Sequence, residues 1–369
     1  MKRVLILTNV GIGLYKFRRE LIEQLISNEY EVFFSCNNDE YVPKLQELGC
    51  KYIETDFGRR SRNVFGDIKL AVRYIAILKD IKPDVVLTYT IKPNIYGGLV
   101  CGFLRIPCLS NITGLGTAVA HKGFLQVITT FLYWIALGNV QWVFFQNQEN
   151  LDSFKRKGIV KDKYTLLPGS GVNLSEHSPL PYEESDTTNF LFVSRILKEK
   201  GIEQYLDAAV ATKKEYPETK FAIVGSCEQE YDSARMDALH QAGIITYHGM
   251  QSNVRPFYAN AHCVVHPTYY PEGMSNVLLE ASACARPIIS TDRCGCREII
   301  NDGTNGYMIR QEDSLDLIEK VQRFLSLPFE DREQMGLAGR AKVEMEFNRQ
   351  IVVDAYIEKI ESCMTGRCK

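Results

Sequence analysis

The sequence lacks both a strong net charge and any simple repeat. Its 369 residues carry a formal net charge of −2, which argues against nucleic acid as a main partner. We find no repeat of solenoid period and no low-complexity tract. Lys2 and Arg3 lead directly into the strand-like run 4–8, without an apolar leader or a cleavage site. We therefore expect a cytoplasmic protein that has no signal peptide.

A disulfide framework is also missing. The eleven cysteines are odd in number and scattered, and several lie within apolar runs, as Cys101 and Cys263 do. This distribution is typical of reduced cysteines in a cytosolic protein. Cys294 and Cys296 have neither a second pair of cysteines nor histidines at zinc-binding spacing, so we predict no metal site there.

Charged residues are absent from one long stretch, residues 123–146, which approaches the length of a membrane-spanning helix. Polar residues interrupt this stretch, and Gly138 followed by Asn139 is typical of a helix end. We therefore interpret it as a buried or interface-lying helix followed by a core strand at 140–145, and not as a transmembrane helix.

The small net charge hides an asymmetry between the two halves of the chain. Residues 1–165 hold 22 lysines and arginines against 15 acids, whereas the remainder holds 21 against 30. A basic first half indicates contact with an anionic partner, such as a membrane surface or a lipid diphosphate. Charges spread over a solvated face would produce the same count. The candidate surface combines Lys16, Arg18 and Arg19 with the basic loop 59–62.

Short apolar runs alternate with amphipathic stretches along the whole chain, which predicts doubly wound parallel α/β sheets. The predicted strands of the first half lie at 4–8, 31–35, 51–54, 85–89 and 108–111. The alternation resumes at residue 190, after a polar run with two prolines. The chain is long enough for two cores. We predict a first domain at 1–173, a linker at 174–189, a second domain at 190–347 and a final helix at 348–369.

The most informative segment runs from residue 266 to residue 309. The apolar run 263–265 ends in a bend rich in proline and glycine, and a helix that Ser275 can cap begins soon after it. A further apolar run at 287–290 is the next predicted parallel strand. A strand, a bend and a helix in this order offer unpaired helix amides to an anion.

The side chains in this segment suit a nucleotide-sugar diphosphate. We expect the amides of Met274, Ser275 and Asn276 to hold phosphate, because they lie at the positive end of the helix dipole. Glu272 in the bend could bind a sugar hydroxyl, and Glu280, eight positions later, could bind a ribose diol. In isolation the two glutamates could also be a solvated loop acid and a surface helix residue.

The pair of glutamates resembles the E-x7-E signature of family 4 retaining glycosyltransferases of the GT-B fold. Arg297-Glu298, Asp302-Gly303 and Asn305-Gly306 match that family's usual RE…DG.NG run. The resemblance covers nearly the whole chain and implies two Rossmann-like doubly wound domains that face each other across a cleft. It also implies that the last helix returns to the first domain. The implied enzyme is a hexosyltransferase that binds its donor in the second domain and its acceptor in the first.

Family members keep an arginine and a lysine at the spacing of Arg195 and Lys200. The resemblance implies that these cations neutralise the departing diphosphate without a metal, and that they are catalytic together with Glu272. Loops after the next strands line the nucleotide base in relatives. The expected donor-binding residues of this domain are therefore Gly225, Met250, Gly273, Met274, Ser275, Asn276 and Glu280.

In the first domain, the resemblance implies that Gly11 and Gly13 let a loop approach the donor diphosphate, although a tight strand-to-helix turn would also use them. The segments 88–97 and 111–116 resemble the YTIKPNIYG…NITGLG pattern of a subgroup that builds bacterial surface polysaccharides on a polyprenyl carrier. Many relatives have a histidine near the donor sugar where Ile91 stands here. The expected acceptor-side residues are Lys92, Asn94, Thr113 and Gly114.

The resemblance implies a metal-independent, retaining transferase without a cofactor or a covalent enzyme intermediate. The expected donor is a UDP-sugar, such as one of galactose or N-acetylgalactosamine. The expected acceptor is a polyprenyl-diphosphate-linked saccharide in capsule, O-antigen or exopolysaccharide synthesis, which implies peripheral contact with the inner face of the cytoplasmic membrane. A nucleotide-sugar epimerase of the same fold and a non-catalytic sugar-nucleotide-binding partner remain alternatives. A nicotinamide oxidoreductase is disfavoured, because Lys16 occupies the third glycine position of the dinucleotide fingerprint.

Overall fold

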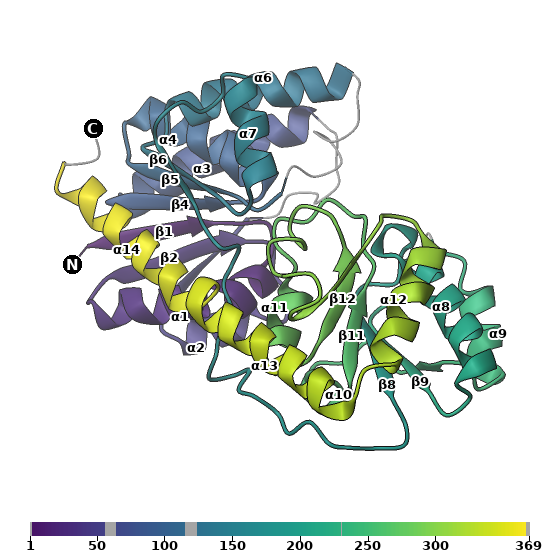
Figure 1. Cartoon of the computed structure of the whole chain (residues 1–369). Coiled ribbons are helices and arrows are strands. Elements are labelled where there is room, and N and C mark those ends of the chain that lie inside the picture. Colours follow the sequence, from purple (N-terminus) through teal and green to yellow (C-terminus); the bar gives the residue numbers. More distant parts are fainter. Residues whose placement is uncertain (1, 56–63, 115–123, 230, 367–369) are drawn as a thin grey trace. The chain divides into compact units, whose positions relative to one another are not determined.

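The computed structural model describes residues 2–55, 64–114, 124–229 and 231–366. The chain divides into two compact units. The first unit contains Met1–Gly171 and Arg349–Lys369, and the second contains Val172–Asn348. The chain therefore leaves the first unit once and returns to it with its last helix (Figure 1).

The first unit is built on a parallel sheet of seven strands in the order β3-β2-β1-β4-β5-β6-β7. Its strands are β1 (Arg3–Leu7), β2 (Glu31–Cys36), β3 (Lys51–Glu54), β4 (Val85–Tyr89), β5 (Cys108–Ile112), β6 (Trp142–Phe145) and β7 (Tyr164–Leu166). β1, β4 and β5 are almost wholly buried, as expected for parallel strands covered on both faces. The strand order reverses between β1 and β4, which makes that gap the switch point of the sheet.

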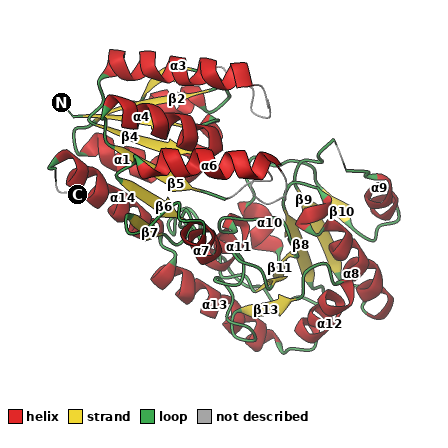
Figure 2. Cartoon of the chain, turned by 90° about the horizontal axis from the view of Figure 1, so that it is seen from above, coloured by secondary structure: helices red, strands yellow, loops and turns green. Residues whose placement is uncertain are grey.

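Helices cover both faces of this sheet (Figures 1 and 2). The first unit contains α1 (Gly11–Ser27), α2 (Val42–Glu47), α3 (Val64–Ile81), a π-helical turn η1 (Pro93–Gly97), α4 (Gly98–Leu104), α6 (Phe124–Gly138), α7 (Gln148–Arg156) and α14 (Arg349–Met364). One core lies between the sheet and α1, α2 and α14. The other core lies between the sheet and α3, α4, α6 and α7.

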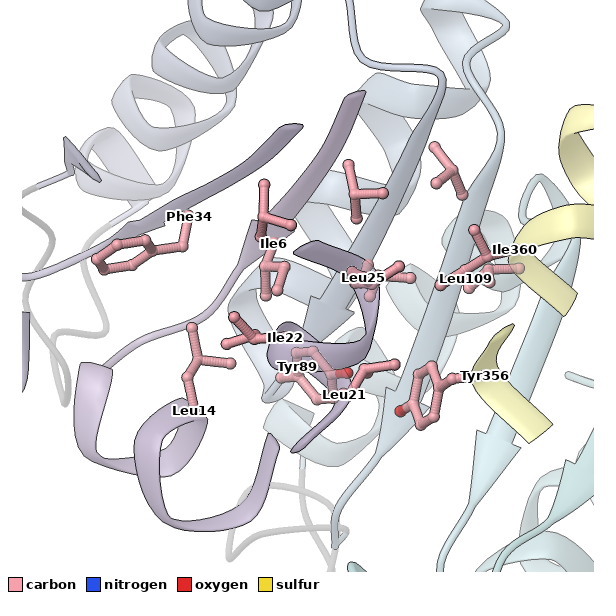
Figure 3. Close-up of a cluster of buried hydrophobic side chains, with 14 of the residues drawn as sticks. Ile6, Leu14, Leu21, Ile22, Leu25, Phe34, Tyr89, Leu109, Tyr356 and Ile360 are labelled. Atoms are coloured by element: carbon pink, nitrogen blue, oxygen red, sulfur yellow. The ribbon is translucent and has the colours of Figure 1, made fainter. Parts of the chain in front are cut away.

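The last helix is part of the first core. Tyr356 and Ile360 of α14 lie among Leu21 and Leu25 of α1 and Leu109 of β5 (Figure 3). Arg349, at the start of α14, forms an ion pair of 2.9 Å with Glu20 of α1. The hydrophobic face of α14 therefore binds the helix to the first unit, although the whole second unit precedes it in sequence.

The second unit contains a parallel sheet of six strands in the order β10-β9-β8-β11-β12-β13. Its strands are β8 (Asn189–Val193), β9 (Lys220–Val224), β10 (Thr246–Tyr247), β11 (Cys263–His266), β12 (Ile288–Thr291) and β13 (Gly306–Ile309). Its helices are a 3-10 turn η2 (Lys198–Lys200), α8 (Ile202–Glu215), α9 (Ala234–Gln241), α10 (Arg255–Asn260), α11 (Asn276–Ala283), α12 (Ser314–Leu325) and α13 (Phe329–Glu346). One core contains residues of α8, α9 and α12, and the other contains residues of α10, α11 and α13. The predicted pair of doubly wound parallel sheets is thus confirmed.

The structure places the predicted linker, residues 174–189, within the second unit. The buried guanidinium of Arg286 donates to the carbonyl of Pro181 at 2.6 Å. The hydroxyl of Tyr182 donates to the carbonyl of His262 at 2.9 Å. The polar composition of this segment suits a chain that runs over the surface of one unit while its backbone carbonyls are used as acceptors.

One residue of the expected basic surface, Arg18, does not lie at the surface. Arg18 is buried, and its guanidinium lies 5.3 Å from the ring centre of Tyr89 and 5.7 Å from that of Tyr356. Its position on the inward face of α1 decides this placement, and the sequence count of charges could not reveal it. Lys16 is exposed, and the loop 59–62 lies outside the described residues.

The packing of α14 can be tested by removing a buried side chain. Replacing Ile360, which is fully buried, with alanine should lower the free energy of unfolding by about 2–5 kcal/mol, because it leaves a cavity against the sheet. Replacing the exposed Glu358 of the same helix with alanine should change it by less than about 0.5 kcal/mol. Urea unfolding followed by circular dichroism measures both. Equal effects would contradict the assignment of α14 to the core.

Candidate functional site

The candidate site lies at the switch point of the second sheet, where the strand order reverses between β8 and β11. In open parallel sheets, ligands bind beyond the carboxyl ends of the strands at such a point. The chain leaving β8 contains Arg195 and Lys200, and the chain leaving β11 contains Glu272. The parallel arrangement therefore brings together residues that lie more than seventy positions apart in sequence.

Lys200 and Glu272 form a direct ion pair and hydrogen bond. Only 9% of the lysine side chain and 18% of the glutamate side chain are exposed. The Lys200 ammonium also lies 4.7 Å from the ring centre of Tyr270. Two of the three residues predicted to be catalytic thus contact each other. Their charges neutralise one another, so neither side chain is buried as an isolated ion.

Arg195, the third predicted catalytic residue, is exposed and is a second cation near the ring of Tyr270. Its guanidinium is 5.8 Å from the Tyr270 ring centre and forms a 3.2 Å ion pair with Glu228. Tyr270 and Glu228 did not stand out in the sequence. An aromatic ring next to the Pro271-Glu272 bend was the only available signal, and it is equally common in structural turns.

His266 ends β11 and is fully buried beneath this pair. Its Nε2 lies 3.9 Å from Oε1 of Glu272, and neither ring nitrogen has a hydrogen-bond partner among the described residues. Burial, reinforced by the nearby Lys200 charge, lowers the pKa of His266 to about 3. The imidazole is therefore neutral at working pH, and Lys200 is the cation that neutralises Glu272.

The helix that follows the bend begins as predicted. Ser275 is its N-cap and accepts a hydrogen bond from the amide of Leu278. The amide of Ser275 itself donates to the carbonyl of Gly295 at 2.8 Å, so it is not available to a phosphate in this structure. The sequence could not reveal this contact, because Gly295 lies twenty residues after Ser275, beyond strand β12 in the chain. Met274 is buried, and Asn276 begins the helix.

The residues that match the RE…DG.NG run shape the loop behind this helix. Glu298 accepts a hydrogen bond of 2.7 Å from the amide of Gly295. Asn305 donates to the carbonyl of Ile299 at 2.9 Å and accepts from the amide of Asn301 at 2.7 Å. The Glu298 contact holds Gly295, whose absent side chain leaves room for Glu272 and Gly273.

Glu280 lies inside α11 and accepts a 3.1 Å hydrogen bond from the hydroxyl of Tyr258. Burial and the neighbouring Glu280 carboxylate raise the pKa of Tyr258 well above its ordinary value, so the tyrosine remains a donor. The loops predicted to line the base follow β9 and β10. Gly225 has a φ of 153° and lies so close to the Ser194 carbonyl that a side chain could not fit. Met250 is exposed.

The two glycines predicted to approach the donor, Gly11 and Gly13, lie within helix α1 and not in a loop before it. The amide of Gly11 donates to the carboxylate of Asp39 at 2.6 Å, and the amide of Ile12 donates to the same oxygen at 3.4 Å. A side chain at Gly11 would contact Asp39, whereas one at Gly13 would meet nothing within 4 Å. In this structure the positive end of α1 therefore already binds a carboxylate.

The predicted acceptor-side residues lie in the chain segments that follow β4 and β5. Lys92 forms an ion pair of 2.9 Å with Asp67. Asn94 is buried, accepts from the hydroxyl of Thr88 at 2.8 Å and donates to the carbonyl of Asn111 at 2.8 Å, so it connects β4 and β5. Thr113 and Gly114 follow β5 directly.

No helix in the described ranges is long and apolar enough to cross a membrane. Within the same residues, no group of three or more histidine, cysteine, aspartate or glutamate side chains could hold a metal ion.

A model of a known protein family matches a large part of each unit. The model of group 1 glycosyl transferases matches residues 173–342, and a glycosyl transferase 4-like model matches residues 3–147. The chain is a glycosyltransferase. This confirms the predicted recognition and the predicted enzyme class, a hexosyltransferase.

Two curated relatives match over long ranges. One is the N,N'-diacetylbacillosaminyl-diphospho-undecaprenol alpha-1,3-N-acetylgalactosaminyltransferase of Campylobacter jejuni, 26% identical over 96% of this chain and 97% of the relative. The other is the capsular polysaccharide biosynthesis glycosyltransferase CapM of Staphylococcus aureus, 25% identical over 80% of each chain. This glycosyltransferase thus resembles bacterial surface-polysaccharide enzymes over most of its length.

Solved structures show the same fold. Anabaena HepE in complex with UDP and glucose has a TM-score of 0.81 at 15% identity, covering 98% of this chain and all of that one. A glycosyltransferase from Rickettsia africae has a TM-score of 0.80 at 18% identity, covering 98% of each chain. The predicted GT-B fold class is confirmed by these likenesses.

The burial of a neutral His266 leads to a prediction about how folding stability depends on pH. Because its pKa is lower in the folded protein than in the unfolded chain, folding stability should fall as pH decreases below about 6.5. Between pH 7 and pH 5 the native chain should lose about 2 kcal/mol more than His266→Leu or His266→Gln. Urea unfolding at a series of pH values measures this difference. Parallel pH profiles for all three chains would show that His266 is not buried as a neutral group.

Proposed function

We propose that the chain is a retaining, metal-independent glycosyltransferase. It transfers galactose, N-acetylgalactosamine or a similar sugar from a UDP-sugar to a polyprenyl-diphosphate-linked saccharide in surface-polysaccharide synthesis. The observation that carries the proposal is the meeting of Lys200 with Glu272 at the switch point, with Arg195 beside the same tyrosine. The names of the Campylobacter and Staphylococcus relatives support the acceptor and the pathway class.

The site residues divide the donor between them. Lys200 and Arg195 bind the diphosphate, and their two positive charges offset the charge that grows on it as it departs. Glu272 accepts hydrogen bonds from sugar hydroxyls, and Glu280 accepts them from the ribose. Backbone groups around Gly225 and Met250 line the base. The amides of Met274 and Asn276 complete the phosphate contacts, with Gly273 allowing close approach.

The reaction proceeds on one face of the sugar. The bond between the anomeric carbon and the diphosphate oxygen breaks, and its electron pair stays on the diphosphate. The acceptor hydroxyl oxygen forms the new bond to the anomeric carbon from the same face. Its proton passes to the departing diphosphate oxygen. Glu272 positions the sugar and forms no covalent bond with it, and two protein cations take the role that a divalent metal has in other transferases.

Donor binding requires an exchange of partners, because the cation intended for the diphosphate is paired with the acid intended for the sugar. As the diphosphate enters, Lys200 turns from Glu272 to the phosphate oxygens, and Glu272 is released toward the sugar hydroxyls. Both charges remain compensated during this exchange, which avoids burying an isolated ion. UDP without a sugar would draw Lys200 away from Glu272 without supplying sugar hydroxyls to that carboxylate.

The transferase activity is tested by release of UDP from a panel of UDP-sugars in EDTA, with and without a short-chain polyprenyl-diphosphate saccharide. Acceptor-dependent release from one donor is expected in the native chain. Glu272→Ala and Arg195→Ala should each lower it by about 100-fold or more. Product formed from the donor alone would indicate an epimerase. Donor binding without release would instead support a non-catalytic partner. Proton NMR of the product's anomeric centre tests retention.

The partner exchange gives an independent prediction. Glu272→Gln keeps the shape of the side chain but removes the competing carboxylate. It should therefore tighten UDP binding by about threefold or more, while transfer from the UDP-sugar falls. Glu199→Gln is the matched control, because it removes an exposed acid adjacent to Lys200 in sequence and should leave UDP affinity unchanged. Isothermal titration calorimetry measures these affinities. Weaker UDP binding by Glu272→Gln would contradict the exchange.

A further inference from the structure

Helix α6 of the first unit is apolar on both its inner and its outer face. Its sequence, Phe124–Gly138, contains no charged residue. Tyr133 and Leu137 point into the core beneath the helix. Phe131 and Trp134 are 57% and 54% exposed. A surface helix normally turns a polar face to water, and a helix that is apolar all round is normally covered on all sides.

The exposed side chains of α6 form a stripe. Val127, Phe131 and Trp134 are spaced by four and three residues, so they follow one side of the helix, and Ile128 lies next to them. The rings of Phe131 and Trp134 stack at a centroid distance of 6.2 Å. The stripe therefore presents a continuous aromatic and aliphatic surface and not scattered single residues.

Neighbouring helices extend this surface. α3, α4 and α6 share one core and form one layer over the sheet, with α4 in contact with both of the others (Figure 2). Ile68 and Val72 of α3 and Phe103 of α4 are exposed. We call the exposed apolar residues of the three helices the apolar layer: Phe65, Ile68, Val72, Phe103, Val127, Ile128, Phe131 and Trp134.

The charges next to the apolar layer are mainly basic. Lys69 and Arg73 are exposed on α3, beside Ile68 and Val72, and Arg105 is exposed at the end of α4 next to Phe103. Asp67 of α3 is already paired with Lys92. Aromatic and aliphatic side chains with cations on two of the three helices match the interface of an anionic bilayer, where the apolar groups enter the acyl boundary and the cations meet the headgroups.

We propose that the apolar layer docks the first unit onto the surface of an anionic lipid bilayer, with Phe131 and Trp134 inserted at the headgroup level. Fifteen residues of α6 extend about 22 Å, which is shorter than the hydrocarbon core, so the helix lies along the interface and does not cross it. Tryptophan prefers this depth because its ring is apolar and its N–H is polar. The proposal names the surface by which the proposed function would reach a lipid-linked acceptor.

Tryptophan fluorescence can measure the insertion of Trp134 into a bilayer directly. The chain contains two, and Trp142 is held in the first unit by a 2.8 Å hydrogen bond from its Nε1 to Thr165. In Trp142→Phe, emission comes from Trp134 alone. Adding vesicles of phosphatidylcholine with phosphatidylglycerol should shift this emission to shorter wavelength, and brominated acyl chains should quench it. No donor or acceptor is present, so a failure here is separate from a failure of the transferase proposal.

Variants define the surface. Phe131→Ser/Trp134→Ser should reduce co-sedimentation with the anionic vesicles by about tenfold or more. Lys69→Gln/Arg105→Gln should reduce it by at least about fivefold and weaken its dependence on anionic lipid. Leu315→Ser/Met345→Ser, which removes two exposed apolar residues from the second unit, should bind like the native chain.

Three results would overturn the proposal. One is an absence of vesicle binding by the native chain. Another is equal binding by the native chain and Phe131→Ser/Trp134→Ser. The third is a concentration-dependent dimer, seen by light scattering, that Phe131→Ser/Trp134→Ser abolishes while vesicle binding is unchanged. This last result would assign the apolar layer to contact between copies of the chain.

Discussion

The ion pair between Lys200 and Glu272 depends on a close backbone approach at the switch point of the second sheet. Gly201 follows Lys200 with a φ of 78°, and a side chain there would come within 2.1 Å of the Pro267 carbonyl. The turn after β8 can therefore lie against the chain leaving β11 only because residue 201 is a glycine. This approach places the cation and the acid in contact, and the proposed division of the donor between them follows from it.

The loop behind the pair explains why the signature of this family extends so far beyond its two glutamates. Glu298 and Asn305 bind backbone groups within their own loop. The carbonyl of Gly295 accepts a hydrogen bond from the amide of Ser275, and its lack of a side chain provides room beside Glu272. These signature residues thus determine the shape of the support, and the donor would meet Glu272 and Glu280 in front of it. A motif can be strong evidence for a site although many of its members contact no ligand.

Charged side chains are arranged differently in the two units. In the second unit, opposite charges meet at the site and compensate each other. In the first unit, a carboxylate already occupies the positive end of α1, and Arg18 is buried among tyrosine rings. The outer layer of the first unit is apolar and is bordered by cations. These features agree with the proposed contact of the first unit with a lipid surface and with the proposed binding of an anionic donor by the second unit.

The sequence by itself determined the fold class and the approximate positions of several strands, because apolar runs, helix caps and glycine bends are local signals. Ser275 as an N-cap is one example. The sequence also identified the family, because the signature is read in linear order. Only the tertiary structure decided which side chains meet. It paired Lys200 with Glu272, left the ring nitrogens of His266 without a hydrogen-bond partner among the described residues, and buried Arg18. Each of these outcomes depends on strands and helices distant in sequence, and burial and partners exist only once those elements have packed.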